Sequence, residues 1–164
     1  MKTSKLIYLC AVCLITILPA AAQNRQEKKE KIEREVREAV DSNHYKINVD
    51  RMFPMRGSSK LLTSNYSVEI RNDSVFSYLP YFGVAYSIPY GGGKGLVFNA
   101  PLSEYKAEYH KKGKVKVDFK VRNEEDSYTY NLTIFPNGST SIQVHSTNRQ
   151  PISFQGNMEL KYED

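Results

Sequence analysis

Apolar and polar residues alternate with a period of two along most of this chain, from about residue 45 onward. The clearest run is KVKVDFKVR, where Val115, Val117, Phe119 and Val121 share one face and mostly charged residues occupy the other. Side chains alternate between the two faces of a β-strand, so this run predicts a half-buried strand. Other runs repeat the pattern, and their apolar residues are Tyr45, Ile47 and Val49; Tyr66, Val68 and Ile70; Tyr128, Tyr130, Leu132 and Ile134; Ile142 and Val144; and Met158, Leu160 and Tyr162.

Short turn sequences separate these runs. They are Asn72-Asp73-Ser74, Lys111-Lys112-Gly113, Asn123 to Asp126, and Pro136-Asn137-Gly138. Such connections have no room for a crossover helix, so consecutive strands must be antiparallel. We therefore predict an all-β fold of about eight or nine strands in up-and-down order. A closed β-barrel is favoured because closure removes the exposed edges of an open sheet, and a two-sheet β-sandwich is the alternative.

A helical period precedes the strands, between Gln26 and about Asp41. Pairs of opposite charge four residues apart, such as Glu27 with Lys31, support a helix here. Its apolar stripe is too narrow for a membrane-surface helix, and consists of Ile32, Val36, Ala39 and Val40. We expect this stripe to pack on the body of the domain or to cap one end of it. The predicted organisation is a charged helix in residues 23–43 and a barrel domain in residues 44–164.

The first 22 residues have the organisation of an export signal. Lys2 and Lys5 supply a positive start, and an apolar run follows from Leu6 to Leu18. This run is shorter than the roughly 20 residues that cross a bilayer. Small residues then predict cleavage after Ala22, which leaves no transmembrane segment in the mature chain. We expect a periplasmic or secreted protein.

Composition and charge narrow the picture further. The chain has 164 residues, 40% hydrophobic and 25% charged, which fits one globular domain. Cys10 and Cys13 leave with the signal, so the mature chain is expected to have no disulfide, no thiolate nucleophile and no Cys-ligated metal. The net charge is +5, and it falls by two when Lys2 and Lys5 are removed. Interspersed acidic and basic residues argue against a nucleic-acid partner.

Residues 76–98 are the most unusual stretch, with two prolines, five glycines and seven aromatic rings. Pro80 and Pro89 cannot donate to a central ladder, so we expect this part to be edge-like or bent. One interpretation is a barrel mouth where aromatic rings contact a ligand and hydroxyls orient it. The alternative is that these rings form the core of a domain that lacks Trp. On the first interpretation the ligand-binding residues are Tyr78, Tyr81, Phe82, Tyr86 and Tyr90.

Several stretches also carry a family resemblance. The most specific is Leu79-Pro80-Tyr81-Phe82-Gly83, and others are Gly95-Leu96-Val97-Phe98, the strand Tyr128–Ile134 and the segment Arg149–Gly156, RQPISFQG. Over roughly residues 30–160 the chain resembles a family of exported, Bacteroidota-type bacterial proteins classed as a domain of unknown function, DUF4251. The resemblance implies a single domain, export, and a barrel similar in shape to the lipocalins with an N-terminal helix. It implies no reaction.

Residue patterns typical of catalysis are missing. The three histidines, His44, His110 and His145, match no zinc-binding spacing. The chain has no Gly-x-Ser-x-Gly elbow, which an α/β-hydrolase would need. The sequence GGGKG at residues 91–95 lacks the spacing of a phosphate-binding loop, so we expect residues 91–95 to form a flexible hairpin loop. A pair of carboxylates for glycoside hydrolysis would have to come from Glu104, Glu108, Asp118 or residues 124–126. We expect residues 124–126 to be a solvated hairpin tip.

These observations predict a protein that is not an enzyme and has no cofactor and no metal site. The preferred function is a binding module for a small apolar or amphipathic ligand, in or at the mouth of the barrel. The alternative is an interaction or structural protein of the cell envelope, without a small-molecule ligand. Packing of the interior distinguishes the two, because a small barrel has just enough room for side chains or one small ligand. A ligand would be displaced to the surface by an interior packed with Tyr66, Val68, Val117, Phe119, Tyr130 and Leu132.

Overall fold

The structure, a computed structural model, describes residues 25–87 and 94–160. This part of the chain forms one α-helix, in residues 25–41, and then eight strands. The strands are β1 (His44–Pro54), β2 (Lys60–Arg71), β3 (Ser74–Leu79), β4 (Leu96–Tyr109), β5 (Val115–Arg122), β6 (Ser127–Ile134), β7 (Ser139–Ser146) and β8 (Ile152–Met158), with a 3-10 turn η1 (Lys111–Gly113) between β4 and β5. The all-β prediction is confirmed. The predicted export signal lies outside the described residues.

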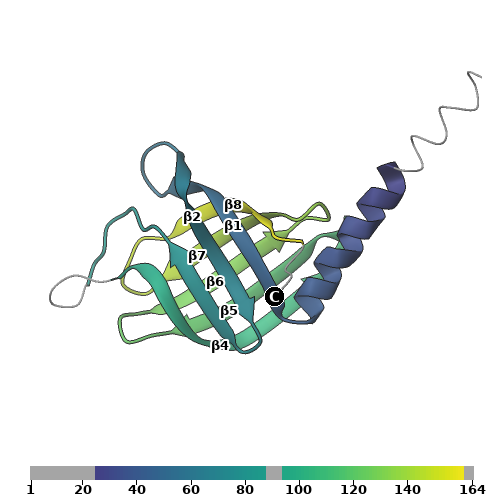
Figure 1. The fold of residues 1–164 in the computed structure, drawn as a ribbon. Helices are drawn as coiled ribbons and strands as arrows, with labels where there is room; N and C mark the ends of the chain where they lie inside the picture. Colours follow the sequence, from purple (N-terminus) through teal and green to yellow (C-terminus); the bar gives the residue numbers. More distant parts are fainter. Residues whose placement is uncertain (1–24, 88–93, 161–164) are drawn as a thin grey trace, which may run out of the picture.

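Each strand pairs antiparallel with the next, and β8 pairs with β1, so the sheet closes into a barrel (Figure 1). The order of strands around the barrel is their order along the chain. This confirms the up-and-down barrel over the β-sandwich. The predicted turn sequences connect β2 to β3, β4 to β5, β5 to β6, and β6 to β7.

Alternation along the strands places the apolar side chains inside the barrel. In β5, Val115, Val117, Phe119 and Val121 are each at most 1% exposed, while the residues between them face outward. The rings of Phe119 and Tyr130, which are paired on the neighbouring strands β5 and β6, stack inside the barrel with centroids 4.9 Å apart and planes inclined by 8°. Burial of this apolar surface is the main favourable contribution to folding.

Hydroxyl groups that enter the barrel find partners there. Ser77 Oγ donates to the Leu96 carbonyl oxygen at 2.7 Å and lies 3.0 Å from the Tyr130 hydroxyl. The hydroxyls of Tyr45 and Tyr105 lie 3.2 Å apart. Burial raises the pKa of Tyr45 and Tyr130 above the usual value for tyrosine, so both hydroxyls keep their protons even at alkaline pH near that usual value. The interior is thus occupied by apolar side chains and by hydroxyls that bond to one another.

The last strand differs from its predicted position. We expected it around Met158, Leu160 and Tyr162, whereas β8 ends at Met158, Leu160 follows it, and Tyr162 lies outside the described residues. The inward-facing residues of β8 are Ile152, Phe154, Gly156 and Met158. Because one of them is a glycine, the alternation of apolar and polar residues is interrupted in the sequence of this strand. A Cβ at Gly156 would overlap the Asn48 carbonyl oxygen of β1, so this position requires a close approach of two backbones.

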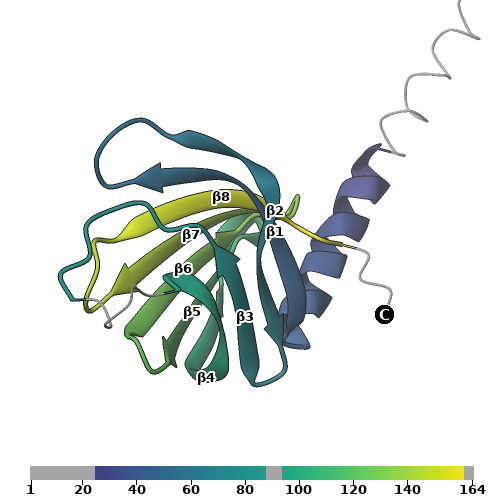
Figure 2. The same cartoon turned by 60° about the vertical axis from the view of Figure 1, so that its left-hand side comes forward.

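The helix closes one end of the barrel. Its Val36 and Val40 are at most 1% exposed and belong to the hydrophobic core, which confirms the predicted apolar stripe. The Tyr109 hydroxyl of β4 donates to the Asp41 carboxylate, and the Arg37 guanidinium lies 5.6 Å from the centroid of the Tyr109 ring. The early turns of the helix extend away from the barrel (Figures 1 and 2). Among the described residues, no helix is both long enough and apolar enough to span a membrane.

Candidate functional site

Four connections form the end of the barrel opposite the helix, which we call the mouth. Their described residues are 55–59 between β1 and β2, 80–87 and 94–95 between β3 and β4, 123–126 between β5 and β6, and 147–151 between β7 and β8. Most of the predicted ligand-binding residues belong to the second connection. The described start of that connection, residues 80–87, is called the strap below.

The strap crosses the mouth. Ala85 forms an antiparallel bridge with Arg149, and the Tyr86 backbone N–H donates to the Asn148 carbonyl oxygen at 2.7 Å. The strap leaves β3, whereas Asn148 and Arg149 connect β7 to β8, four strands farther around the eight-stranded barrel. The chain therefore covers the mouth from one side to the other, and the helix covers the opposite end.

Tyr81 fixes the shape of the strap. Its hydroxyl lies 3.0 Å from the Val84 carbonyl oxygen and 3.1 Å from that of Gln150. The Gln150 backbone N–H in turn donates to the Val84 carbonyl oxygen at 3.0 Å. Burial raises the pKa of Tyr81, although the backbone contact with Gln150 and the charge of Arg149 lower it in part. The hydroxyl is thus engaged with the backbone of the chain itself.

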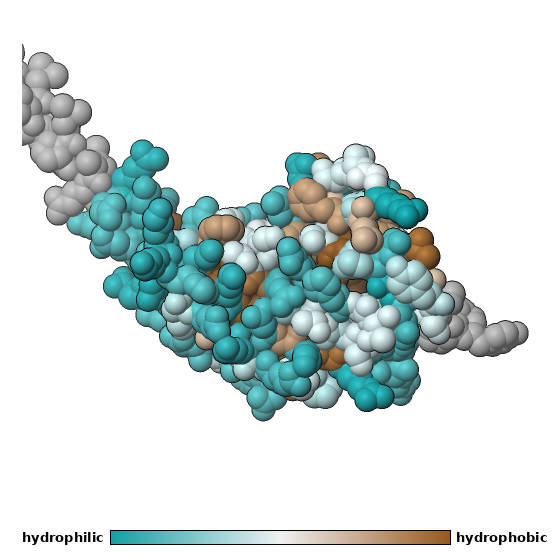
Figure 3. Space-filling model, turned by 180° about the vertical axis from the view of Figure 1, so that it is seen from behind, coloured by the Kyte–Doolittle hydropathy of each residue, from teal (hydrophilic) through white to brown (hydrophobic). Residues whose placement is uncertain are grey.

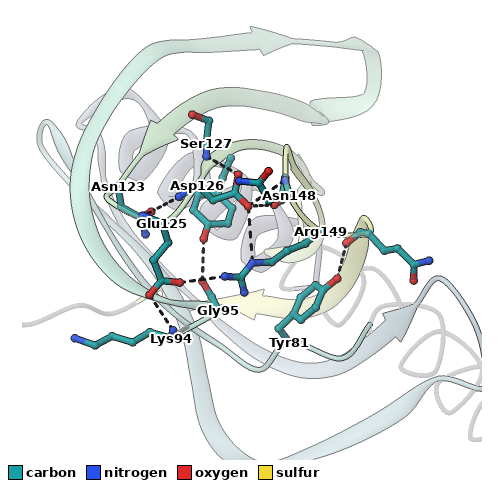
Figure 4. Close-up of polar contacts among 12 residues, drawn as sticks. Tyr81, Lys94, Gly95, Asn123, Glu125, Asp126, Ser127, Asn148 and Arg149 are labelled. Atoms are coloured by element: carbon teal, nitrogen blue, oxygen red, sulfur yellow. Dashed lines mark hydrogen bonds and ion pairs between the residues drawn. The ribbon is translucent and has the colours of Figure 1, made fainter. Parts of the chain in front are cut away.

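Arg149 lies beneath the strap and joins three mouth connections (Figure 4). Its side chain is 4% exposed, and its Nη2 donates to Glu125 Oε2 at 3.0 Å. Its Nε lies 3.8 Å from Asp126 Oδ2, too long for a hydrogen bond. The guanidinium carbon lies 5.7 Å from the centroid of the Tyr81 ring, and Glu125 also accepts a hydrogen bond from the Lys94 backbone N–H. One buried cation therefore holds the strap and two turns together.

The acidic turn at residues 124–126 contradicts our prediction of a solvated hairpin tip. Asp126 is only 6% exposed and Glu125 is half-buried. Asp126 accepts hydrogen bonds from the backbone N–H groups of Ser127, at 2.7 Å, and Asn148, at 3.2 Å, and from the Ser146 hydroxyl. Burial of these carboxylates is offset by Arg149 and by these donors. Sequence analysis missed this network, and its one signal was the RQPISFQG stretch that Arg149 begins.

The structure places the predicted ligand-binding residues in different surroundings. Tyr78 is on the outer face of β3, is 50% exposed, and stacks on Tyr66 with ring centroids 5.4 Å apart. Phe82 is 50% exposed and Tyr86 is 69% exposed. Tyr81 is engaged within the strap, and Tyr90 lies outside the described residues. These rings face outward or hold the strap, and ligand binding by them stays a prediction.

Large apolar side chains are exposed mainly at the mouth. Of eight such residues in the described part of the chain, six belong to the strap, the end of β3 and the β1–β2 hairpin. We call these six residues the mouth patch: Met55, Leu61, Tyr78, Phe82, Val84 and Tyr86. The other two, Tyr109 and Phe135, are at the helix end. In Figure 3, apolar residues are visible toward the end of the barrel away from the helix, and others lie along the barrel wall among hydrophilic residues. Contiguous exposed apolar surface marks interaction sites in soluble proteins.

Residues 25–87 and 94–160 line several hollows on the outside of the barrel. One of about 560 Å³ separates the early helix, at Lys29 and Ile32, from Phe135 and the β6–β7 turn. Two of about 460 and 450 Å³ are on the polar outer face of β5, β6 and β7, and one of about 270 Å³ is beside β7 and β8. No residue of the mouth patch lines any of these hollows. The patch residues are instead at least half exposed, whereas sites for small molecules are concave.

Of the candidate carboxylates, Glu125 and Asp126 converge on Arg149, and the others pair separately on the barrel wall. Glu104 pairs with Lys120, and Asp118 accepts a hydrogen bond from Asn131 at 2.6 Å. Glu108 pairs with Lys106, an ion pair that lowers the pKa of the Glu108 carboxyl. Among residues 25–87 and 94–160, no group of three or more His, Asp or Glu side chains is placed to hold a metal ion.

Comparisons with known proteins agree with this geometry. Residues 27–158 match the family model of the Domain of unknown function (DUF4251). A crystal structure of a DUF4251 family protein from Bacteroides eggerthii DSM 20697 is similar in fold, with a TM-score of 0.60 and 16% sequence identity over 77% of this chain and 86% of that chain. No curated protein matches the sequence. The resemblance found in the sequence is confirmed, and the match to the solved structure concerns the fold.

Proposed function

Because the chain belongs to the DUF4251 family, whose name assigns no activity, we propose from its geometry that it is an exported interaction protein without enzymatic activity. It contacts a partner surface of the cell envelope through the mouth patch. This is the alternative that the sequence left open beside a small-ligand module. Export rests on the signal-like residues 1–22 and remains part of the proposal.

The observation that carries the proposal is the contrast between the inside of the barrel and its mouth. Inside, the rings of Phe119, Tyr128 and Tyr130 are at most 1% exposed; Phe119 stacks on Tyr130, and Tyr128 stacks on Phe98. At the mouth, the strap covers the opening and presents Phe82 and Tyr86 outward, at least half exposed. A filled barrel with an exposed apolar end favours contact with a surface over enclosure of a ligand.

Hydroxyl-radical footprinting, in intact cells and with the purified protein, tests this proposal. Radicals label exposed Met, Leu, Tyr and Phe side chains, and the mouth patch contains all four types. We expect several-fold less labelling of Tyr78, Phe82 and Tyr86 in cells than in the purified protein. Tyr109 and Phe135 are comparably exposed at the helix end and serve as internal controls, with unchanged labelling expected. Equal labelling of the mouth patch in both samples would refute the proposed contact surface.

Export is tested separately by mass spectrometry of the N-terminal peptide from fractionated cells. We expect a chain that begins at Gln23 in the periplasmic or extracellular fraction. A chain that begins at Met1 in the cytosolic fraction would contradict export, whatever the footprinting shows.

A further inference from the structure

The β1–β2 hairpin, residues 51–66, is the most prominent projection at the mouth (Figure 2). β2 pairs with β3 only from Ser67 onward, so residues 60–66 extend past the end of β3. The register between β1 and β2 jumps from Val49 opposite Tyr66 to Arg51 opposite Leu61. Residues 62–65 therefore form a large bulge, and bulges of this kind bend and twist a strand. The β2 arm of the hairpin thus leaves β3, whereas the β1 arm stays paired with β8 as far as Pro54.

Apolar residues lie at the tip of this hairpin and beside it. Met55 is 63% exposed and Leu61 is 66% exposed, and Phe53 is half-buried. Phe82 of the strap, 50% exposed, continues this apolar surface, because Lys60 Nζ lies 3.4 Å from the centroid of its ring. The hairpin thus presents flexible aliphatic side chains next to an aromatic ring.

The charge of the hairpin has a single sign. It carries Arg51, Arg56 and Lys60, all exposed, and its sequence from Arg51 to Tyr66 contains no Asp or Glu. Acidic residues at the mouth belong to the 124–126 turn, which is on the opposite side of the barrel in strand order. Two of those three carboxylates, Glu125 and Asp126, face Arg149, and Glu124 is exposed. Lys94, also exposed, adds a further positive charge at the mouth.

We propose that the β1–β2 hairpin docks the protein on an anionic phospholipid bilayer, with Met55, Leu61 and Phe82 in the interfacial layer and the three hairpin cations against the headgroups. This inference rests on the proposed function, because it names the partner of the mouth patch. Apolar side chains flanked by cations match such an interface in both polarity and charge. A projecting tip also suits a fluid bilayer, which requires no concave complementary surface.

Co-sedimentation with lipid vesicles tests the proposal. The probes are vesicles of phosphatidylglycerol with phosphatidylethanolamine, and vesicles of phosphatidylcholine alone. We expect binding to the anionic vesicles, little binding to the neutral ones, and weaker binding at high salt, because salt screens surface charges. Substitution of both Met55 and Leu61 by Ser should remove most of the binding. Failure of the unmodified protein to bind anionic vesicles, or equal binding to both kinds, overturns the proposal.

A matched pair of charge variants separates the hairpin from net charge. The double variant Arg56→Glu with Lys60→Glu should weaken binding to anionic vesicles by at least about tenfold, since each basic residue near such a surface contributes about fivefold. The control, Lys111→Glu with Lys116→Glu, makes the same change in net charge on exposed residues outside the mouth. It should bind nearly as well as the unmodified protein. Equal losses in the two variants would overturn a specific role for the hairpin.

The absence of Trp from the chain provides an independent readout. In a Leu61→Trp variant, Trp fluorescence should shift to shorter wavelength when anionic vesicles are added, because the indole leaves water. In a Phe135→Trp variant, at the helix end, it should not shift. A shift at residue 135 and none at residue 61 would overturn the proposal. The two proposals can fail separately. If the mouth patch is protected in cells but the protein does not bind vesicles, the lipid partner is wrong and the proposed function stands. If the mouth patch is not protected in cells, the proposed function itself fails.

Discussion

Replacement of Arg149 by Met should destabilise the mouth more than any change of a surface charge. The guanidinium is 4% exposed, and it faces the Glu125 carboxylate at 3.0 Å and the Asp126 carboxylate, whose side chain is fully buried, at 3.8 Å. Methionine fills much of the same volume but leaves both carboxylates without their cation. Removal of one partner from a buried ion pair costs about 3–5 kcal/mol, and that is the loss we expect in the free energy of unfolding.

Urea unfolding followed by far-ultraviolet circular dichroism measures this loss. Arg122→Met is the matched control, because Arg122 is exposed on the outer face of β5 and the substitution is chemically identical. It should change the free energy of unfolding by no more than about 0.5 kcal/mol. A triple variant that adds Glu125→Gln and Asp126→Asn to Arg149→Met should recover part of the loss, since no charge then remains buried. If Arg149→Met and Arg122→Met have the same small effect, our reasoning about the network is wrong.

Other predictions concern the barrel itself. Val117→Asp should cost several kcal/mol, because Val117 is fully buried and an aspartate there has no partner, whereas Lys116→Asp on the opposite face should cost little; equal effects in urea would show that the faces are assigned wrongly. Gly156→Ala should lower the melting temperature, because its Cβ would overlap the backbone of β1, and an unchanged melting temperature would contradict this close approach. Stability should also fall as pH rises above about 10, because unfolded tyrosines lose their protons near their usual pKa while burial holds the pKa of Tyr45 and Tyr130 higher. Urea midpoints measured between neutral and alkaline pH test this, and a midpoint that stays constant would contradict it.

Local patterns were sufficient to predict the fold. Alternation in β5, turn sequences between neighbouring strands and the apolar stripe of the helix each depend on residues close together in the sequence. They led to an up-and-down barrel with one helix, which the strand order confirms. β8 was misplaced because Gly156 interrupts the apolar pattern, and a glycine required by backbone contact looks the same in sequence as one in a loop.

The candidate site depends on contacts between distant segments, and these were harder to predict. Asp126 looked like part of a solvated tip, because Arg149 and Asn148, which offset its burial, come more than 20 residues later. The strap looked like an irregular edge, and its bridge to Arg149 across the mouth has no local signature. The abundance of aromatic residues also could not show which tyrosines hold the strap and which are exposed. The Tyr81 hydroxyl contacts backbone oxygens, whereas Tyr86 is 69% exposed.

The central claim is that the barrel is filled by its own side chains and acts through its outer surface. Native mass spectrometry of the protein purified from its own compartment tests this most directly. We predict the mass of the polypeptide alone, without a small molecule that survives gentle desolvation. A stoichiometric small molecule, released only when the barrel unfolds, would contradict the claim and restore a ligand to the interior.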